Sequence, residues 1–188
     1  MSKKKVTRRA FLATTASAVL GCSTMGRRAP GKLSVRSPNE VPNLAAIGCG
    51  GKGQSDIVGA EEAGANVVAL CDVDFQHAGQ AVNWWPDAPR YSDFRKMLDK
   101  HPEIDMVTIS TPDHTHAPAA IHAMAMGKHV YVQKPLTITI GEAEQMLEAS
   151  RKYGVATQMG NQGHSDPGVR QTCEWIWDGA IGDVTEVH

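Results

Sequence analysis

The sequence predicts an α/β fold built on a doubly wound parallel sheet, and three observations favour it. Short apolar runs of strand length recur between residues 44 and 159 of the 188-residue chain. Stretches with a helical pattern separate these runs, and glycine or polar residues follow them. Strands that alternate with helices are typical of a parallel sheet with helices on both faces. Ligands bind such sheets at the carboxyl ends of the strands, so the residues after each strand are the functional candidates.

The first predicted strand, at residues 44–47, runs directly into a glycine-rich loop. Gly48, Gly50 and Gly53 have the spacing G-x-G-x-x-G, and Gly51 adds a fourth glycine. The first glycine permits a tight turn, the second lets the backbone approach a pyrophosphate, and the third lets helix and strand pack closely. The N-terminus of the following helix would attract the phosphates. By itself, this spacing is equally compatible with a turn that binds nothing.

The second predicted strand, at residues 66–71, ends at Asp72, which lies about 20 residues beyond the loop. A dinucleotide-binding fold places there the carboxylate that binds the adenosine ribose hydroxyls. An acid repels a 2′-phosphate, and neither Val73 nor Asp74 could hold one, so the sequence favours NAD over NADP. We therefore predict a Rossmann-like, NAD(P)-binding domain over residues 44–160. Methyltransferases that use S-adenosylmethionine share the loop and the acid, and they are the alternative at this point.

The later elements continue the alternation. Further strands are predicted at residues 104–110, 129–132 and 155–159, where apolar residues cluster. Ser92 is a candidate N-cap for a short helix, and Thr139 with Glu142 forms the pattern of a capping box. The helix that follows this box should stop at Gly154. The remaining helices are expected at residues 53–63, 75–85 and 118–126.

The first 43 residues differ from the rest and indicate export. Residues 1–22 combine a basic start with an apolar stretch of about ten residues, too short for a stable membrane anchor. The pair Arg8 and Arg9 resembles the twin-arginine signal, which would export the folded protein to the periplasm. Cys22 follows a sequence that resembles a lipobox, so a lipid on Cys22 is the one membrane contact we expect. Residues 23–43 are predicted to be a flexible tether.

Charge and cysteine content narrow the possible functions. A chain that begins at Cys22 carries 14 basic and 20 acidic residues, a net charge of −6. This charge gives no electrostatic case for binding nucleic acid. The sequence contains no C-x-x-C pair, so it suggests neither a zinc ribbon nor a redox dithiol. Cys49 and Cys71 are best interpreted as buried free thiols.

Three strand-end segments carry the remaining chemistry, and all should open onto the face that holds the glycine loop. They are TPDHTH at residues 111–116, QKP at residues 133–135 and GNQGH at residues 160–164. Together with GKHVYV before QKP, these motifs resemble the Gfo/Idh/MocA oxidoreductases. The resemblance covers about residues 44–188. It implies an N-terminal Rossmann domain followed by a C-terminal α/β domain with a large, mostly antiparallel sheet.

The resemblance also implies a function. Members of the family oxidise or reduce sugars and cyclitols with NAD(P), and some related exported proteins use bound NAD to cleave glycosidic bonds. Residues 161–188 would be the truncated start of the second domain, and further catalytic residues and the determinants of specificity would lie beyond them. A homo-oligomer is expected for the full-length protein. Because its second domain is incomplete, this chain alone could instead be a non-catalytic nucleotide-binding fragment.

Lys134 is the first catalytic candidate. In the family, the lysine of an E-K-P motif lies near the nicotinamide and the reacting hydroxyl, and this chain has Gln133 in place of the acid. A cation there would stabilise the oxyanion that develops as a hydride leaves, or assist loss of the hydroxyl proton. The competing interpretation is a surface lysine before a rigid turn. His164, after the last strand, is the second candidate because it could reach the substrate.

The turn at residues 111–116 has two interpretations. By resemblance, Thr111, Asp113 and His116 would face the nicotinamide ribose, and Gln133 and Lys134 would complete the cofactor site. Alternatively, Asp113 and His116 cap the following helix. Several histidines beside an aspartate could also suggest a metal site, but their spacing matches no known ligand set, and we expect no metal.

Overall fold

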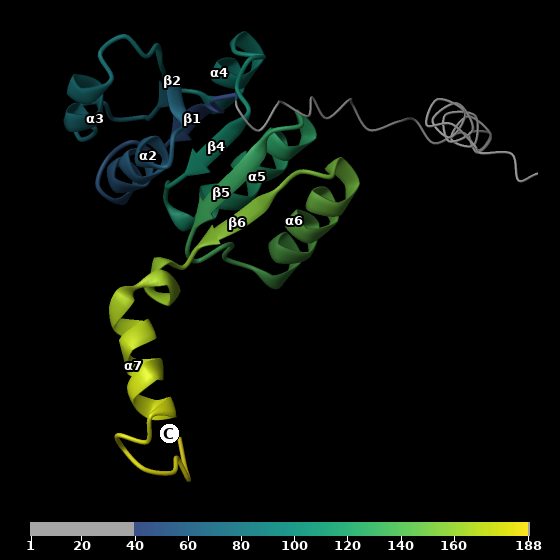
Figure 1. Ribbon diagram of the computed structural model, residues 1–188. Helices are drawn as coiled ribbons and strands as arrows, with labels where there is room; N and C mark the ends of the chain where they lie inside the picture. The colour runs from purple at the N-terminus through teal and green to yellow at the C-terminus, as the bar shows by residue number, and fades with distance from the viewer. Residues whose placement is uncertain (1–39, 188) are drawn as a thin grey trace, which may run out of the picture.

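Within residues 40–187, six parallel strands form one sheet in the order β3-β2-β1-β4-β5-β6, and Figure 1 labels all of them except β3. The computed structural model describes residues 40–187. Its strands are β1 (Asn43–Ile47), β2 (Asn66–Cys71), β3 (Arg90–Tyr91), β4 (Met106–Ile109), β5 (His129–Gln133) and β6 (Thr157–Gly160). The order reverses between β1 and β4, which pair in parallel from Leu44–Met106 to Ile47–Ile109. Such a switch point opens a crevice at the carboxyl ends of the strands. The predicted doubly wound parallel sheet is therefore confirmed.

Among the described residues, six α-helices and two 3₁₀ turns connect and extend the strands. The helices are α2 (Lys52–Glu62), α3 (Gly79–Trp84), α4 (Phe94–Lys100), α5 (His116–Ala125), α6 (Ile140–Tyr153) and α7 (Pro167–Trp177). The 3₁₀ turns are η1 (Asp113–Thr115) and η2 (Gln162–Ser165). No helix in this part of the chain is long and apolar enough to span a membrane.

The sheet is buried on both faces around β1. Ala45 and Ile47 belong to one core cluster, which includes residues of α4, α5 and α6. Leu44 and Ala46 belong to the other cluster, together with residues of α2 and α3. Successive strand residues point to opposite faces of the sheet, so a fully apolar strand contributes side chains to both core clusters. This explains why residues 44–47 show no alternation of polar and apolar positions.

Several local predictions are confirmed. The capping box is present: the Thr139 hydroxyl accepts from the Glu142 N–H, and the Glu142 carboxylate accepts from the Thr139 N–H. Helix α6 ends at Gly154, whose φ of 65° lies in the left-handed region that glycine tolerates. Strand β2 has the predicted limits of residues 66 and 71.

Other local predictions were wrong, for identifiable reasons. The helix predicted at residues 75–85 begins only at Gly79, because the Asp74 carboxylate accepts the N–H groups of Gln76 and His77 and holds a turn there. The cap of α4 is Asp93, which accepts from the Arg95 N–H at 3.0 Å, and not Ser92. Strand β3 was not predicted, because two residues give no periodicity.

The last helix projects away from the sheet (Figure 1). No helix was predicted at α7, although Asp166 caps it through the Gly168 N–H and Pro167 occupies its first turn. Its Trp175 and Trp177 side chains are 56% and 82% exposed. The predicted signal at residues 1–22, Cys22 and most of the predicted tether lie outside the described residues.

Candidate cofactor cleft and active site

The glycine loop joins β1 to α2 with little spare space. The Gly48 N–H donates to the Cys71 carbonyl oxygen at 2.8 Å, and Gly48 has a φ of 84°. A Cβ on Gly53 would lie 2.1 Å from the Gly48 carbonyl oxygen, closer than any side chain permits. Only glycine at position 53 therefore lets α2 start this near to β1, which keeps the helix N-terminus at the loop.

Asp72 is fixed at the end of β2 by two backbone groups. One carboxylate oxygen accepts from the Cys49 N–H at 2.7 Å, and the other accepts from the Asp74 N–H at 2.9 Å. Each oxygen keeps a free lone pair, because a carboxylate has about four acceptor sites. Asp72 can therefore bind ribose hydroxyls while it holds the glycine loop to β2.

A cavity of about 780 Å³ unites four of the predicted cofactor residues: Gly48, Gly50, Asp72 and Thr111. Its volume lies within the range of about 300–1,000 Å³ that is usual for ligand sites. Two glycines of the loop, which carry no side chain, line this cavity together with the oriented carboxylate of Asp72. These residues fit a dinucleotide, which needs close approach at its phosphates and an acceptor at its ribose. Gly51 and Gly53 shape the loop without lining the cavity.

Other residues of the cavity were missed by the sequence analysis. His77 covers the loop, since a Cβ on Gly50 would lie 2.6 Å from its Cδ2 atom. Phe94 and Arg95 also line the cavity, as does His114 of the segment at residues 111–116, which the sequence had already singled out. Arg95 brings a guanidinium to the cavity that Asp72 also lines, and no motif indicated it, because Arg95 belongs to α4, which is separated in sequence from the glycine loop. Its Nε donates to the Asp93 carboxylate at 2.9 Å.

His116 ties two strand-end segments together from a buried position. Its Nδ1 lies 2.7 Å from the Pro135 carbonyl oxygen, and its Nε2 lies 2.8 Å from the Thr111 carbonyl oxygen. The side chain is at the first position of α5 and almost fully buried. The helix-capping alternative was wrong, because no side chain caps α5. Asp113 is exposed in η1. It lines neither the cofactor cavity nor the cavity that contains Lys134 and His164.

The two predicted catalytic residues line a second cavity of about 510 Å³. Lys134 follows β5 and His164 lies in η2 after β6. Gly160, Asn161, Gln162, Gly163 and Val169 complete the lining. The cavity therefore lies where the ends of β5 and β6 meet the start of α7. It brings together an ammonium and an imidazole that are 30 positions apart in the sequence.

Gln133 does not line this second cavity; its side chain contacts a buried acid, Asp56, that no motif in the sequence indicated. The Gln133 amide nitrogen donates to the Asp56 carboxylate at 2.7 Å. Asp56 lies on α2 and also pairs with Lys52. The i,i+4 spacing of Lys52 and Asp56 was visible in the sequence, but it is also the pattern of an ordinary surface pair.

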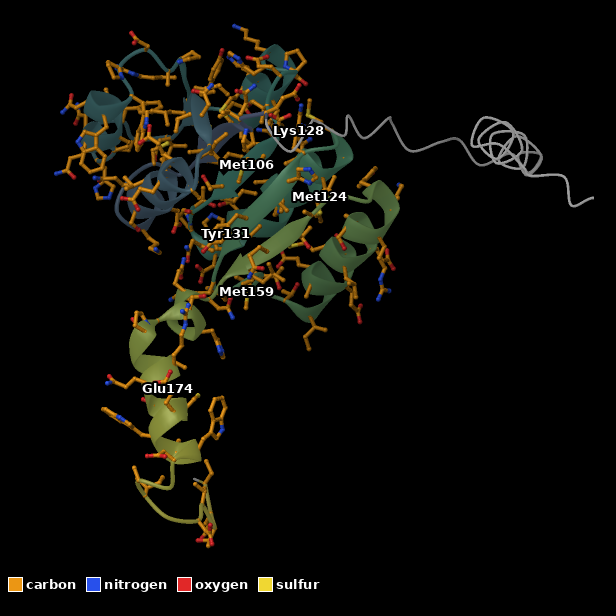
Figure 2. The ribbon with its side chains drawn as sticks, viewed as in Figure 1. Met106, Met124, Lys128, Tyr131, Met159 and Glu174 are labelled. Atoms are coloured by element: carbon orange, nitrogen blue, oxygen red, sulfur yellow. The ribbon has the colours of Figure 1, made fainter. Side chains whose placement is uncertain are left out.

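Burial and nearby negative charge raise the pKa values of two thiols and one tyrosine in this region. Burial, reinforced by the charge of Asp72, raises the pKa of both Cys49 and Cys71 to about 12. These thiols are therefore protonated at neutral pH, in agreement with a structural role. Burial, followed by the negative charge of Asp56, also raises the pKa of Tyr131. Tyr131 stands on β5 (Figure 2), and its hydroxyl accepts from the Gln162 amide at 2.8 Å.

The sheet order, the glycine loop and the Asp72 carboxylate at the end of β2 define a dinucleotide-binding domain of the Rossmann type. The profile of the Gfo/Idh/MocA family, described as an oxidoreductase family with an NAD-binding Rossmann fold, matches residues 43–161. The chain belongs to this family. The cofactor class is therefore a nicotinamide dinucleotide.

Individual relatives agree with this assignment. The chain is 33% identical over 149 residues to inositol 2-dehydrogenase of Burkholderia multivorans, covering 77% of this chain and 44% of that protein. It is 32% identical over 98 residues to a glycosyl hydrolase family 109 protein of Shewanella pealeana, covering 47% of this chain and 21% of that protein. Myo-inositol 2-dehydrogenase from Lactobacillus plantarum matches with a TM-score of 0.69 at 25% identity, over 77% of this chain and 43% of that one. The chain thus spans less than half the length of these relatives.

Proposed function

We propose that this chain is the cofactor-binding part of an NAD-dependent oxidoreductase that acts on a hydroxyl of a sugar or cyclitol. In this proposal, Lys134 is the catalytic cation and His164 assists at the substrate. A second domain, of the kind that the family resemblance implies, completes the substrate site and sets specificity. The dehydrogenase names of the relatives support the substrate class.

The observation that carries the proposal is the connection between the two cavities. Thr111 lines the cofactor cavity and Lys134 the second cavity, and His116 links the carbonyl of Thr111 to that of Pro135. Ser110 and Gln133 provide a parallel link, because both donate to Asp56 at 2.7 Å. The backbone on both sides of Lys134, an exposed residue, is thereby held relative to the cofactor cleft. Such fixed geometry is what hydride transfer requires of its catalytic groups.

The roles of the side chains follow from their chemistry. Bound NAD⁺ would accept a hydride from the carbinol carbon of the substrate. The Lys134 ammonium can donate a hydrogen bond to the substrate oxygen as negative charge develops there, and a neutral amine at the same position could take its proton. The His164 imidazole, in the same cavity, can orient the substrate or carry that proton onward.

We infer a preference for NAD over NADP. The Asp72 carboxylate would lie against a 2′-phosphate, and like charges in contact are unfavourable. Arg95, which also lines this cavity, already donates to Asp93 through both Nε and Nη2. Its charge is therefore largely compensated. We further propose that the cofactor stays bound through the catalytic cycle, because an exported enzyme meets little free NAD.

A second candidate function is NAD-assisted cleavage of a glycosidic bond. The similarity to the Shewanella pealeana protein supports it, and so does the twin-arginine pattern at Arg8 and Arg9. Both functions begin with oxidation of a substrate hydroxyl, so Lys134 has the same role in each. A non-catalytic nucleotide-binding fragment is the third possibility for this chain alone.

The test uses the complete protein, including the second domain. Purified protein with bound NAD⁺ is mixed with a panel of sugars, cyclitols and glycosides, and absorbance at the wavelength of reduced nicotinamide is recorded in a single turnover. A dehydrogenase leaves the cofactor reduced after oxidation of a free sugar or cyclitol. A glycosidase returns it to the oxidised form and releases an aglycone. The absence of any transient reduction, in protein shown to bind NAD, would overturn both enzymatic functions.

A further inference from the structure

Asp56 is a buried acid that connects the glycine-loop helix to three strand ends. Its side chain is only 4% exposed, although it lies one turn into α2. One carboxylate oxygen accepts from the Ser110 hydroxyl and from the Gln133 amide, both at 2.7 Å. The other pairs with the Lys52 ammonium at 2.9 Å and is 3.4 Å from the Gln162 amide nitrogen. Every partner is a donor, as a carboxylate requires.

The three neutral partners come from three different strands. Ser110 follows β4, Gln133 is the last residue of β5, and Gln162 follows β6. Tyr131 supports the group from β5, where its hydroxyl accepts from Gln162 (Figure 2). Gly160 leaves room for the cluster, because a Cβ there would lie 2.7 Å from the Gln133 amide nitrogen. A single carboxylate thus holds the ends of β4, β5 and β6 against the helix that begins at the glycine loop.

Both polar atoms of the Gln133 amide have a hydrogen-bond partner, and the partner of its nitrogen is Asp56. The nitrogen donates to Asp56, and the oxygen faces the Lys134 N–H at 3.3 Å. A glutamate at position 133 could still accept from Lys134, but it would oppose the Asp56 carboxylate with a second buried acceptor. An unpaired buried charge is strongly unfavourable. Position 133 is where the E-K-P motif of the family carries its acid, and in this chain the acid is instead on α2.

We propose that Asp56 is a positioning residue of the active site: it orients Gln133, and through it the Lys134 backbone, relative to the glycine loop. The amide at position 133 is required because the buried negative charge resides on Asp56. This inference rests on the proposed function only in so far as Lys134 is catalytic. The pairing of Asp56 with Gln133 can be measured without catalysis.

The test is a charge exchange between the two positions. Three variants are compared with the unmodified chain: Gln133→Glu, Asp56→Asn, and the double variant with both changes. Thermal unfolding and NADH affinity are measured for each. Gln158→Glu is the matched control, because it adds the same charge at an exposed position of the neighbouring strand β6.

We expect Gln133→Glu to lower the unfolding temperature and to weaken NADH binding by about tenfold, the scale of one unsatisfied buried polar group. Asp56→Asn should have a smaller effect, since it keeps an acceptor oxygen. The double variant should recover most of the loss caused by Gln133→Glu, because the amide introduced at position 56 can then donate to the carboxylate introduced at position 133. Gln158→Glu should match the unmodified chain. If Gln133→Glu does not fold, the unfolding temperature and NADH affinity of the double variant are compared with those of Asp56→Asn, and this comparison tests the pairing.

Additive losses in the double variant, or an unchanged Gln133→Glu variant, would overturn the pairing. In the complete protein at saturating NAD⁺, the positioning role predicts that Gln133→Glu slows reduction of the bound cofactor and that the double variant restores the rate. A variant that is less stable but reduces its cofactor at the parental rate would leave Asp56 with a structural role and overturn the positioning role. If no substrate reduces the cofactor in any form, the proposed function fails, while the stability and affinity measurements still judge the pairing.

Discussion

The Cys49 N–H donates to the Asp72 carboxylate at 2.7 Å, so the acid at the end of β2 holds the glycine loop directly. One residue therefore has two tasks in the cofactor cleft. In the proposed cofactor site its charge would oppose a 2′-phosphate, and its oxygen secures the backbone of the glycine loop. Substitutions that remove only the charge can separate these two tasks.

We predict that the chain binds NADH more tightly than NADPH and that Asp72→Asn narrows the difference. Asparagine keeps an acceptor oxygen for Cys49 but loses the repulsive charge, so NADPH binding should strengthen while the loop stays in place. Asp72→Ala should weaken binding of both nucleotides, because the loop also loses its hydrogen bond. Fluorescence titration of both nucleotides measures the effect. Equal affinities in the unmodified chain would show that Asp72 does not select the cofactor.

Two glycines on the same helix should respond in opposite directions to alanine. Gly53→Ala places a Cβ 2.1 Å from a backbone oxygen, so we expect a loss of about 1–3 kcal/mol in the free energy of unfolding and a loss of nucleotide binding. Gly59→Ala meets no atom within 4 Å, and it should stabilise the chain by about 0.5–1 kcal/mol. Denaturant unfolding measures both changes. Similar stabilities for the two variants would contradict the close approach at Gly53.

The buried thiols should resist alkylation at neutral and mildly alkaline pH. Burial and the charge of Asp72 raise the pKa of Cys49 and Cys71 to about 12, so the reactive thiolate is scarce at pH 8 and becomes more abundant as the pH rises. Cys173, which is only partly buried, is the internal control. Peptide mapping after brief exposure to iodoacetamide should find the label on Cys173 well before Cys49 or Cys71. Equal labelling in the folded chain would contradict their burial.

Local sequence determined much of the fold and only part of the candidate site. The glycine loop, Asp72 and the capping box were predictable because each depends on residues that are close in sequence. Asp56, Arg95 and His77 were missed because their roles depend on how α2, α4 and the turn before α3 pack around the strand ends. His116 was assigned to the cofactor or to a helix cap, whereas its ring contacts the carbonyl oxygens of Thr111 and Pro135. A buried histidine and a surface histidine look alike in a single sequence.

Export can be tested independently of the fold. We predict that replacing Arg8 and Arg9 with lysine retains the precursor in the cytoplasm, because the twin-arginine route distinguishes arginine from lysine. The matched control replaces Lys4 and Lys5 with arginine, which preserves charge and leaves the pair intact. Cell fractionation measures the outcome, and normal export of the lysine variant would reject the signal. Labelling with a lipid precursor should depend on Cys22, and the absence of label with Cys22 present would reject lipidation.

The last prediction concerns Lys134, which combines a position after β5 with a cavity shared with His164. In the complete protein, Lys134→Ala should slow single-turnover reduction of bound NAD⁺ by about 10²-fold or more, the usual contribution of a positioned acid–base group. NADH affinity should change far less, because the glycine loop and Asp72 would contact the cofactor on the other side of β4. Lys152→Ala is the matched control, since it removes an exposed lysine of α6.

A Lys134→Ala variant that reduces its cofactor at the parental rate would remove Lys134 from the mechanism. The same assay on His164→Ala would then show whether the second residue of the cavity carries the chemistry. If Lys134→Ala instead loses its affinity for NADH, the lysine acts in cofactor binding. Comparing the loss of reduction rate with the loss of NADH affinity in Lys134→Ala therefore shows whether Lys134 acts in the reaction or in cofactor binding.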